Sequence, residues 1–226
     1  MFKDIFDFEG RRIKKNIDAK NPYRDDFYEE RLEELKTRVD QKRFTHTMGV
    51  IEMSQILAEE YHADIGKARL AALLHDWDKC YTDEEMRKRI YQVGADVQTT
   101  PEVIEDMPRT LHGLTAAFGL GIKYPEIPSD VLRAVMVHTT ADTHMSALDM
   151  IIYIADALDP SRNYSEYDEL VELIGKVSLQ DLFVKVYGEA TVAVIRKGKI
   201  LHPRTGEIWN YHIKKYYDRH PELCKS

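Results

Sequence analysis

Apolar residues recur at helical spacing along most of this chain. The pattern is clearest after about Arg43, where apolar and small residues form one helical face: Val50, Ile51, Ser54, Leu57, Ala58 and Tyr61. Alternation with a period of two never persists long enough to indicate a sheet, and the β-prone run at 191–195 continues a helical pattern. The pattern therefore predicts an all-α protein.

Polar caps divide this pattern into separate helices. Asp64, Thr82 and Ser146 are typical N-cap residues, and Glu85 completes a capping box with Thr82. Thr205 is the expected cap of the last helix. The predicted helices span approximately residues 25–39, 43–61, 65–79, 83–93, 112–118, 131–138, 147–158, 166–175, 178–196 and 206–218, with a short helix within 95–110.

The regularity of the pattern predicts one main domain. Residues 1–40 are charged and poorly periodic, and we expect an N-terminal extension that is partly helical and partly irregular. Residues 41–218 carry the regular helical pattern and are expected to form a helical bundle, followed by a short tail at 219–226.

The charge balance argues against a polyanionic macromolecular partner. The 226 residues carry a formal net charge of −7, so no global basic field favours nucleic acid or an acidic membrane surface. An anionic substrate would have to be bound by local groups. We see no signal-peptide core and no apolar stretch of about 20 residues. The two cysteines, Cys80 and Cys224, indicate a reducing compartment, so we expect a cytoplasmic protein.

Two histidines and two aspartates stand where helices would bring them together. His46 lies near the start of one predicted helix and His75-Asp76 near the end of the next, so an antiparallel pair places them side by side. Asp156 interrupts an apolar run at 150–155, where a carboxylate is costly unless it is paired or metal-bound. Two imidazoles and two carboxylates suit iron, manganese or zinc better than magnesium or calcium.

Further histidines and basic residues extend this candidate site. His112 and His138 each stand at a predicted helix end, where they could bind a second metal ion, contact phosphate or act only as surface caps. Arg43, Lys79 and Arg162 lie close to the four residues in sequence and would bind phosphate. Alternatively, Lys79 neutralises a nearby aspartate and Arg43 is a solvated surface charge. Four further histidines lack such a sequence context and are predicted to be surface residues: His62, His144, His212 and His220.

These motifs together resemble a known family, the HD-domain metal-dependent phosphohydrolases. Within it, the chain is similar to the YqeK-type symmetrical bis(5′-nucleosyl)-tetraphosphatases. The resemblance covers about residues 41–215. The matching stretches are Arg43-Phe44-Thr45-His46-Thr47, Ala71 to Lys79, Leu111-His112-Gly113, His138-Thr139-Thr140, Met145 to Asp156, Asp159-Pro160-Ser161-Arg162 and Ile200 to Thr205.

The resemblance implies a substrate and a set of roles. The implied reaction is cleavage of diadenosine tetraphosphate into two molecules of ADP, with one or two divalent metal ions, by resemblance iron. The implied metal ligands are His46, His75, Asp76 and Asp156. The residues expected to act in catalysis are Asp76, Lys79, His112 and His138. The expected nucleotide contacts are Arg43, Asp76, Trp77, Asp78, Lys79, His112, His138, Thr139, Thr140, Arg162, Ile200, His202, Pro203 and Thr205.

Three positions depart from the family pattern. Ala141 stands where the family usually has glycine, Asp159 replaces a glutamate, and Asp78 is an additional acid. The alternatives are another HD-domain activity on deoxynucleotides or guanosine tetraphosphate, a non-catalytic nucleotide sensor, and a helical scaffold with structural histidines. A homodimer is compatible with the sequence.

Overall fold

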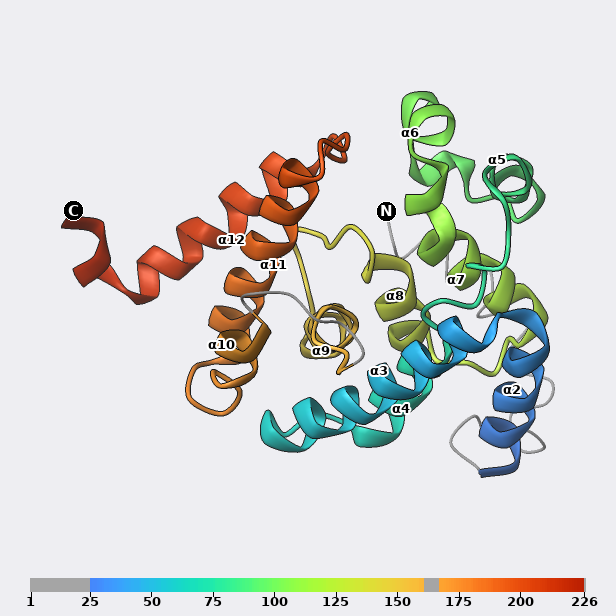
Figure 1. Cartoon of the computed structure of the whole chain (residues 1–226), viewed down its shortest axis with the longest axis horizontal. Coiled ribbons are helices and arrows are strands. Elements are labelled where there is room, and N and C mark those ends of the chain that lie inside the picture. The colour runs from blue at the N-terminus through green and yellow to red at the C-terminus, as the bar shows by residue number, and fades with distance from the viewer. Residues whose placement is uncertain (1–24, 161–166, 226) are drawn as a thin grey trace.

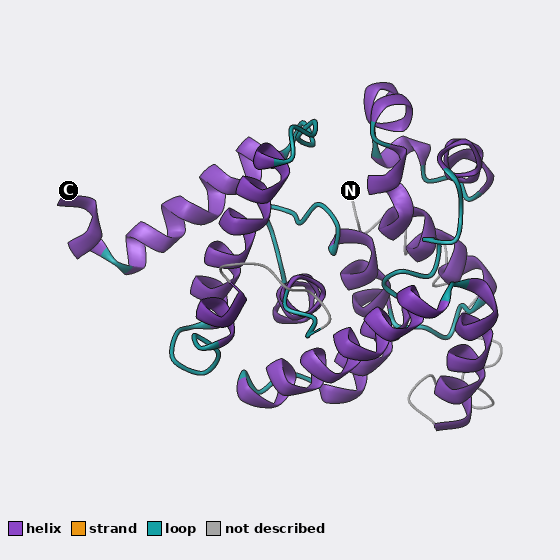
Figure 2. Ribbon diagram, viewed as in Figure 1, coloured by secondary structure: helices purple, strands orange, loops and turns teal. Residues whose placement is uncertain are grey.

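Helices and connecting loops make up the described part of the chain. The structure is a computed structural model that describes residues 25–160 and 167–225, and no strand occurs among them (Figure 2). The α-helices are α2 (Asp25–Arg38), α3 (Gln41–Glu60), α4 (Ile65–Leu74), α5 (Asp83–Gln92), α6 (Pro101–Asp106), α7 (His112–Lys123), α8 (Ser129–Val137), α9 (Ala147–Ala157), α10 (Tyr167–Val171), α11 (Leu179–Arg196) and α12 (Thr205–Arg219). Short 3₁₀ helices are η2 (Asp96–Gln98), η3 (Pro108–Leu111) and η4 (Pro221–Lys225). The predicted all-α class is confirmed.

Several predicted helix starts are confirmed by their caps. The Asp64 side chain accepts a hydrogen bond from the backbone N–H of Lys67, and Thr82 and Ser146 each form a capping box. The predicted cap at Thr205 is wrong, because Thr205 is the first residue of α12 and Arg204 occupies the cap position without a side-chain cap bond.

A predicted long helix at 65–79 is also wrong at its C-terminal end. Helix α4 ends at Leu74, and the chain continues through tight turns in which Trp77 N–H donates to Leu74 O at 3.1 Å and Lys79 N–H to Asp76 O at 3.0 Å. These hydrogen bonds reach back three residues instead of four, so the backbone is wound more tightly here than in an α-helix. The turn carries Asp76 and Lys79 toward the neighbouring helices.

The core lies where α3, α4, α7, α8, α9 and α11 meet (Figure 1). Helix α2 belongs to the same core, because Leu35 is fully buried and Phe27 and Tyr28 are buried with it. A smaller apolar cluster joins α5, α6 and η3 beside the main core. None of the helices in the described ranges is long and apolar enough to cross a membrane. The helical ends that converge on the main core carry the candidate site.

Candidate metal centre

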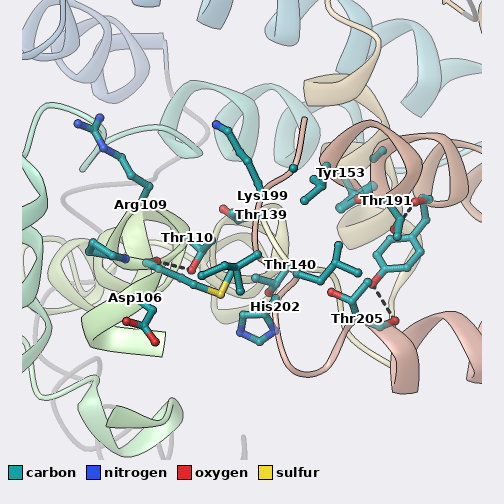
Figure 3. Close-up of a pocket in the computed structure, with 18 of the residues that line it drawn as sticks. Asp106, Arg109, Thr110, Thr139, Thr140, Tyr153, Thr191, Lys199, His202 and Thr205 are labelled. Carbon is teal, nitrogen blue, oxygen red and sulfur yellow. Dashed lines mark hydrogen bonds between the residues drawn. The ribbon is translucent and has the colours of Figure 1, made fainter. Parts of the chain in front are cut away.

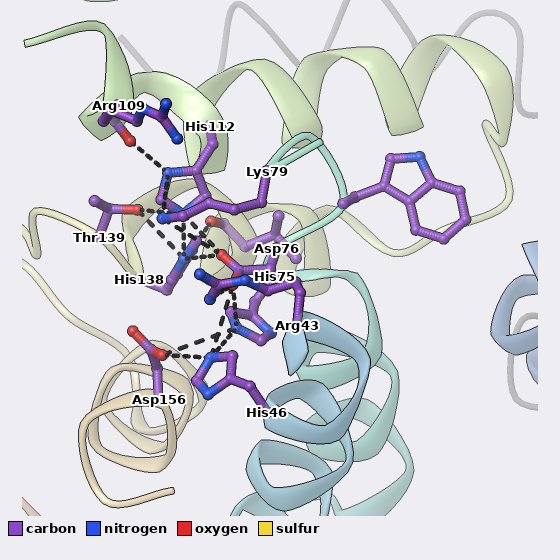
Figure 4. Close-up of polar contacts among 12 residues, drawn as sticks. Arg43, His46, His75, Asp76, Lys79, Arg109, His112, His138, Thr139 and Asp156 are labelled. Atoms are coloured by element: carbon purple, nitrogen blue, oxygen red, sulfur yellow. Dashed lines mark hydrogen bonds and ion pairs between the residues drawn. The ribbon is translucent and has the colours of Figure 1, made fainter. Parts of the chain in front are cut away.

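Five helices deliver their polar side chains to one point in the core. His46 comes from the first half of α3, His75 caps α4, and Asp76 follows in the turn. His112 opens α7, His138 caps α8, and Asp156 lies in α9. All except Asp156 are buried. Figure 4 shows a continuous set of polar contacts that runs from Arg109 through these residues to His46.

The ligand-type atoms of this cluster lie within a few ångströms of one another. His46 Nε2 is 3.0 Å from Asp156 Oδ1 and 3.4 Å from His75 Nε2. Asp76 Oδ1 is 2.9 Å from His112 Nε2, which is 3.0 Å from His138 Nε2. Two sets could hold a metal ion, with their ligand atoms all within 4.8 Å of one another: His46, His75 and Asp156, and His75, Asp76 and His138.

The outer nitrogens of the four imidazoles are all engaged. Nδ1 of His75, His112 and His138 faces the carbonyl oxygen three residues back, at 2.7, 2.7 and 2.6 Å. Each of these nitrogens donates to its carbonyl, because a carbonyl can only accept. Nδ1 of His46 lies 2.7 Å from the carboxylate of Asp159.

This pattern points the Nε2 lone pairs inward, where they face one another. Two lone pairs at 3.0–3.4 Å repel unless a cation or a proton lies between them. Donors of this kind, with carboxylates beside them, fit a divalent metal ion bound at the centre of the cluster.

Asp159 and Gly49 belong to this site, although the sequence pattern predicted no role for them in it. Asp159 is fully buried and contacts His46, as a carboxylate that orients a metal-binding imidazole does. A Cβ atom on Gly49 would lie 1.9 Å from Asp159 Oδ1, so only glycine leaves room for this carboxylate. In the sequence, the signal that pointed to this position was Asp159 itself, which replaces the glutamate usual in the family.

The electrostatics keep the carboxylate ionised and one imidazole neutral. Burial opposes ionisation of Asp76, but the neighbouring imidazoles of His75, His112 and His138 hold the pKa of Asp76 well below its usual range. Burial and the charge of Lys79 lower the pKa of His112 to about 4. Burial also lowers the pKa of His46, but Asp156 and Asp159 outweigh it and raise the pKa above its usual value.

Two cations and one hydroxyl stand over the cluster. Arg43 Nη1 lies 2.5 Å from Asp76 Oδ2, and Lys79 Nζ lies 3.2 Å from His112 Nε2. Thr139 Oγ1 is 3.3 Å from the Nε2 atoms of both His112 and His138. These groups can receive the oxygens of a phosphate that approaches the cluster.

Other residues expected at the site lie elsewhere. Trp77 is buried in the apolar core. Asp78 is fully buried between Arg38, at 3.3 Å, and Arg89, at 3.1 Å, so its carboxylate fixes the turn that carries Asp76. Arg162 lies outside the described residues.

A cavity of about 550 Å³ opens beside the cluster (Figure 3). Thr139, Thr140, Ile200, His202 and Thr205, all predicted nucleotide contacts, line it. Pro203 lines an adjoining cavity of about 470 Å³. The lining of the larger cavity also includes residues for which the sequence predicted no contact with the nucleotide: Arg109, Tyr153, Tyr187 and Lys199.

Fold, cluster and cavity together define an HD-type helical hydrolase. The HD domain family matches residues 43–161, more than half of the chain. A solved structure from Clostridium acetobutylicum, described as a predicted HD superfamily hydrolase involved in NAD metabolism, is 33% identical with a TM-score of 0.75. It covers 83% of this chain, and the match takes in 97% of that protein. The chain belongs to the HD domain family.

Curated relatives narrow the comparison. The symmetrical bis(5′-nucleosyl)-tetraphosphatase of Bacillus subtilis (strain 168) is 28% identical over 183 residues, which are 81% of this chain and 96% of that protein. The protein with the same name from Staphylococcus aureus (strain NCTC 8325 / PS 47) is 27% identical over 178 residues, 78% of this chain and 90% of that protein.

Proposed function

We propose that this protein hydrolyses diadenosine tetraphosphate symmetrically, with a divalent metal ion, to two molecules of ADP. The observation that carries the proposal is the inward convergence of imidazole Nε2 atoms and carboxylates beside Arg43 and Lys79. The cavity next to this cluster has room for a nucleoside. The substrate is inferred from the two curated relatives, which are both named symmetrical bis(5′-nucleosyl)-tetraphosphatases.

The metal ion in this proposal is held by His46, His75, Asp76 and Asp156. Iron is the metal implied by the family resemblance, and manganese and zinc suit the same donors. When bound, such an ion acts as a Lewis acid that withdraws charge from phosphate oxygens and lowers the pKa of water. His112 and His138, with Asp76, provide the donors for a second ion.

The chain's own residues bind and orient the polyphosphate. Arg43 and Lys79 hold its oxygens and offset the negative charge that develops during the reaction. Where a single ion is bound and His112 binds no metal, His112 is neutral at pH 7 and its Nε2 can accept the proton of the attacking water. The water oxygen forms a bond to one central phosphorus as the bridging P–O bond breaks. ADP leaves as a stable anion, so a strong general acid is unnecessary.

Product analysis tests this reaction. The purified protein, loaded separately with Fe²⁺, Mn²⁺ or Zn²⁺, would be incubated with diadenosine tetraphosphate and the products separated by anion-exchange chromatography. We expect ADP alone, two per substrate. A mixture of ATP and AMP contradicts the symmetrical cut, and faster turnover of deoxynucleotides or guanosine tetraphosphate assigns the site to another substrate.

The proposal extends to the organisation of the protein. We place the catalytic unit at residues 41–218, in the cytoplasm, where Cys80 stays a free thiol. A homodimer remains part of the hypothesis, and sedimentation of the purified protein tests it.

A further inference from the structure

One wall of the nucleotide cavity is formed by an exposed segment with few contacts of its own. Residues 195–201, which run from the end of α11 into the loop before α12, are all exposed, and His202 is only partly buried. The backbone hydrogen bonds of this segment are mostly local, for example from Lys199 N–H to Val194 O at 3.2 Å and from Thr205 N–H to His202 O at 2.9 Å. Such bonds shape the segment without attaching it to the site.

Arg204 attaches this segment to the loop that follows α8. Its Nη2 donates to Asp142 Oδ1 at 2.7 Å, and the Asp142 side chain is only 12% exposed. The backbone N–H of Arg204 also donates to His202 Nδ1 at 3.3 Å, which fixes the ring of the residue that faces both cavities. One residue therefore holds the segment and orients His202.

Asp142 is itself firmly held. Arg133 Nη2 lies 3.4 Å from Asp142 Oδ2, and the backbone N–H of Thr143 donates to Asp142 Oδ1 at 2.7 Å. The backbone carbonyl of Asp142 accepts from His212 Nε2 at 2.8 Å. His212 is buried, so the prediction that it is a surface residue is wrong.

The backbone just before Asp142 is strained. Ala141 has φ of +60°, in the left-handed region, where a residue with a Cβ costs about 1 kcal/mol. Strain of this kind persists only where the surroundings impose it, and here it lies between Thr140 of the cavity wall and Asp142.

We propose that Arg204 and Asp142 are positioning residues of the nucleotide site. Their ion pair holds the 198–204 segment against Thr140, so that His202 closes the cavity beside the metal cluster. Figure 3 shows Thr140 and His202 close together in the cavity lining, and both also line the adjoining cavity, which contains Asp142 and Arg204. The ligand that this wall retains is the nucleoside phosphate of the proposed function, on which this inference rests.

Kinetics of matched variants test the role. Asp142→Asn and Arg204→Gln should each raise KM for diadenosine tetraphosphate about tenfold, as loss of one charge-assisted hydrogen bond does, with kcat and metal content nearly unchanged. The double variant should be no worse than either single variant, and Arg204→Lys should restore most of the affinity. Glu207→Gln, which removes the other ion pair of Arg204, is the control and should behave as the parent protein.

Limited trypsinolysis tests the same attachment without turnover. Lys197 and Lys199 lie in the exposed segment, and Asp142→Asn should be cut there several times faster than the parent protein. Titration with ADP should show the same tenfold loss of affinity. The inference is overturned if the KM increases of the two single variants multiply in the double variant. It is also overturned if trypsin cuts Asp142→Asn no faster than the parent protein. A parent protein that binds ADP but does not hydrolyse diadenosine tetraphosphate refutes the proposed function instead.

Discussion

Replacement of Gly49 by alanine probes how the fold positions His46. In an open helix, a change from glycine to alanine stabilises by about 1 kcal/mol. Here the new Cβ would lie 1.9 Å from Asp159 Oδ1, so the carboxylate must move away from His46, which it contacts at 2.7 Å. Loss of a hydrogen bond to a charged group costs about 1.5–3 kcal/mol, so the net result is a destabilisation of about 1 kcal/mol.

The effect of this replacement on metal affinity should be larger than its effect on the free energy of unfolding. A displaced carboxylate no longer orients the His46 ring, and losses of this kind reduce metal affinity about 10–100-fold. Chemical denaturation of the metal-free protein measures the first effect, and competition with a chelator measures the second. Gly206→Ala is the control, because no atom lies within 4 Å of its new Cβ. If Gly49→Ala is more stable than the parent and binds metal equally well, Asp159 does not position His46.

Three further changes test other parts of the structure. Ala141→Gly should stabilise the protein by about 0.5 kcal/mol in denaturant titrations, because relief of the left-handed strain outweighs the added chain entropy; a loss of stability contradicts the strain. Since the pKa of His112 is about 4 in the fold and 6.5 is its ordinary value, the unfolded chain binds more protons between these pH values. The metal-free protein should therefore lose stability as the pH falls from 6.5 toward 4, and His112→Asn should lose less; equal slopes refute this. Asp78→Ala should cost about 3 kcal/mol because it leaves two arginines without their buried partner, whereas Asp83→Ala, in an exposed pair with Arg109, should cost less than about 1 kcal/mol; similar values for the two variants would contradict the role of burial.

The main helices could be predicted from the sequence because caps and apolar spacing are local signals. Asp64, Thr82 and Ser146 cap helices as expected. The end of α4 at Leu74 was missed, since the residues that follow are held by tertiary bonds such as Arg38 to Trp77 O at 3.3 Å. A helical pattern does not contain the partners of such bonds.

The candidate site was predictable only in part for the same reason. Helix ends indicated that His46 and the His75-Asp76 pair would meet, and the structure places them together; their roles as metal ligands stay a prediction. Asp159 lies 113 residues from His46 in the chain, and no spacing rule joins two such positions. His212 was placed on the surface because its partner, the Asp142 carbonyl, is a backbone group that the sequence does not reveal.

The most direct test of the metal centre is anomalous diffraction from crystals of the protein grown with Fe²⁺ and ADP. We predict an iron peak among the side chains of His46, His75, Asp76 and Asp156, with a phosphate of ADP reaching toward Arg43 and Lys79. A crystal that contains ADP but shows no iron peak at these residues, or shows it elsewhere on the protein, would contradict this assignment of the metal ligands.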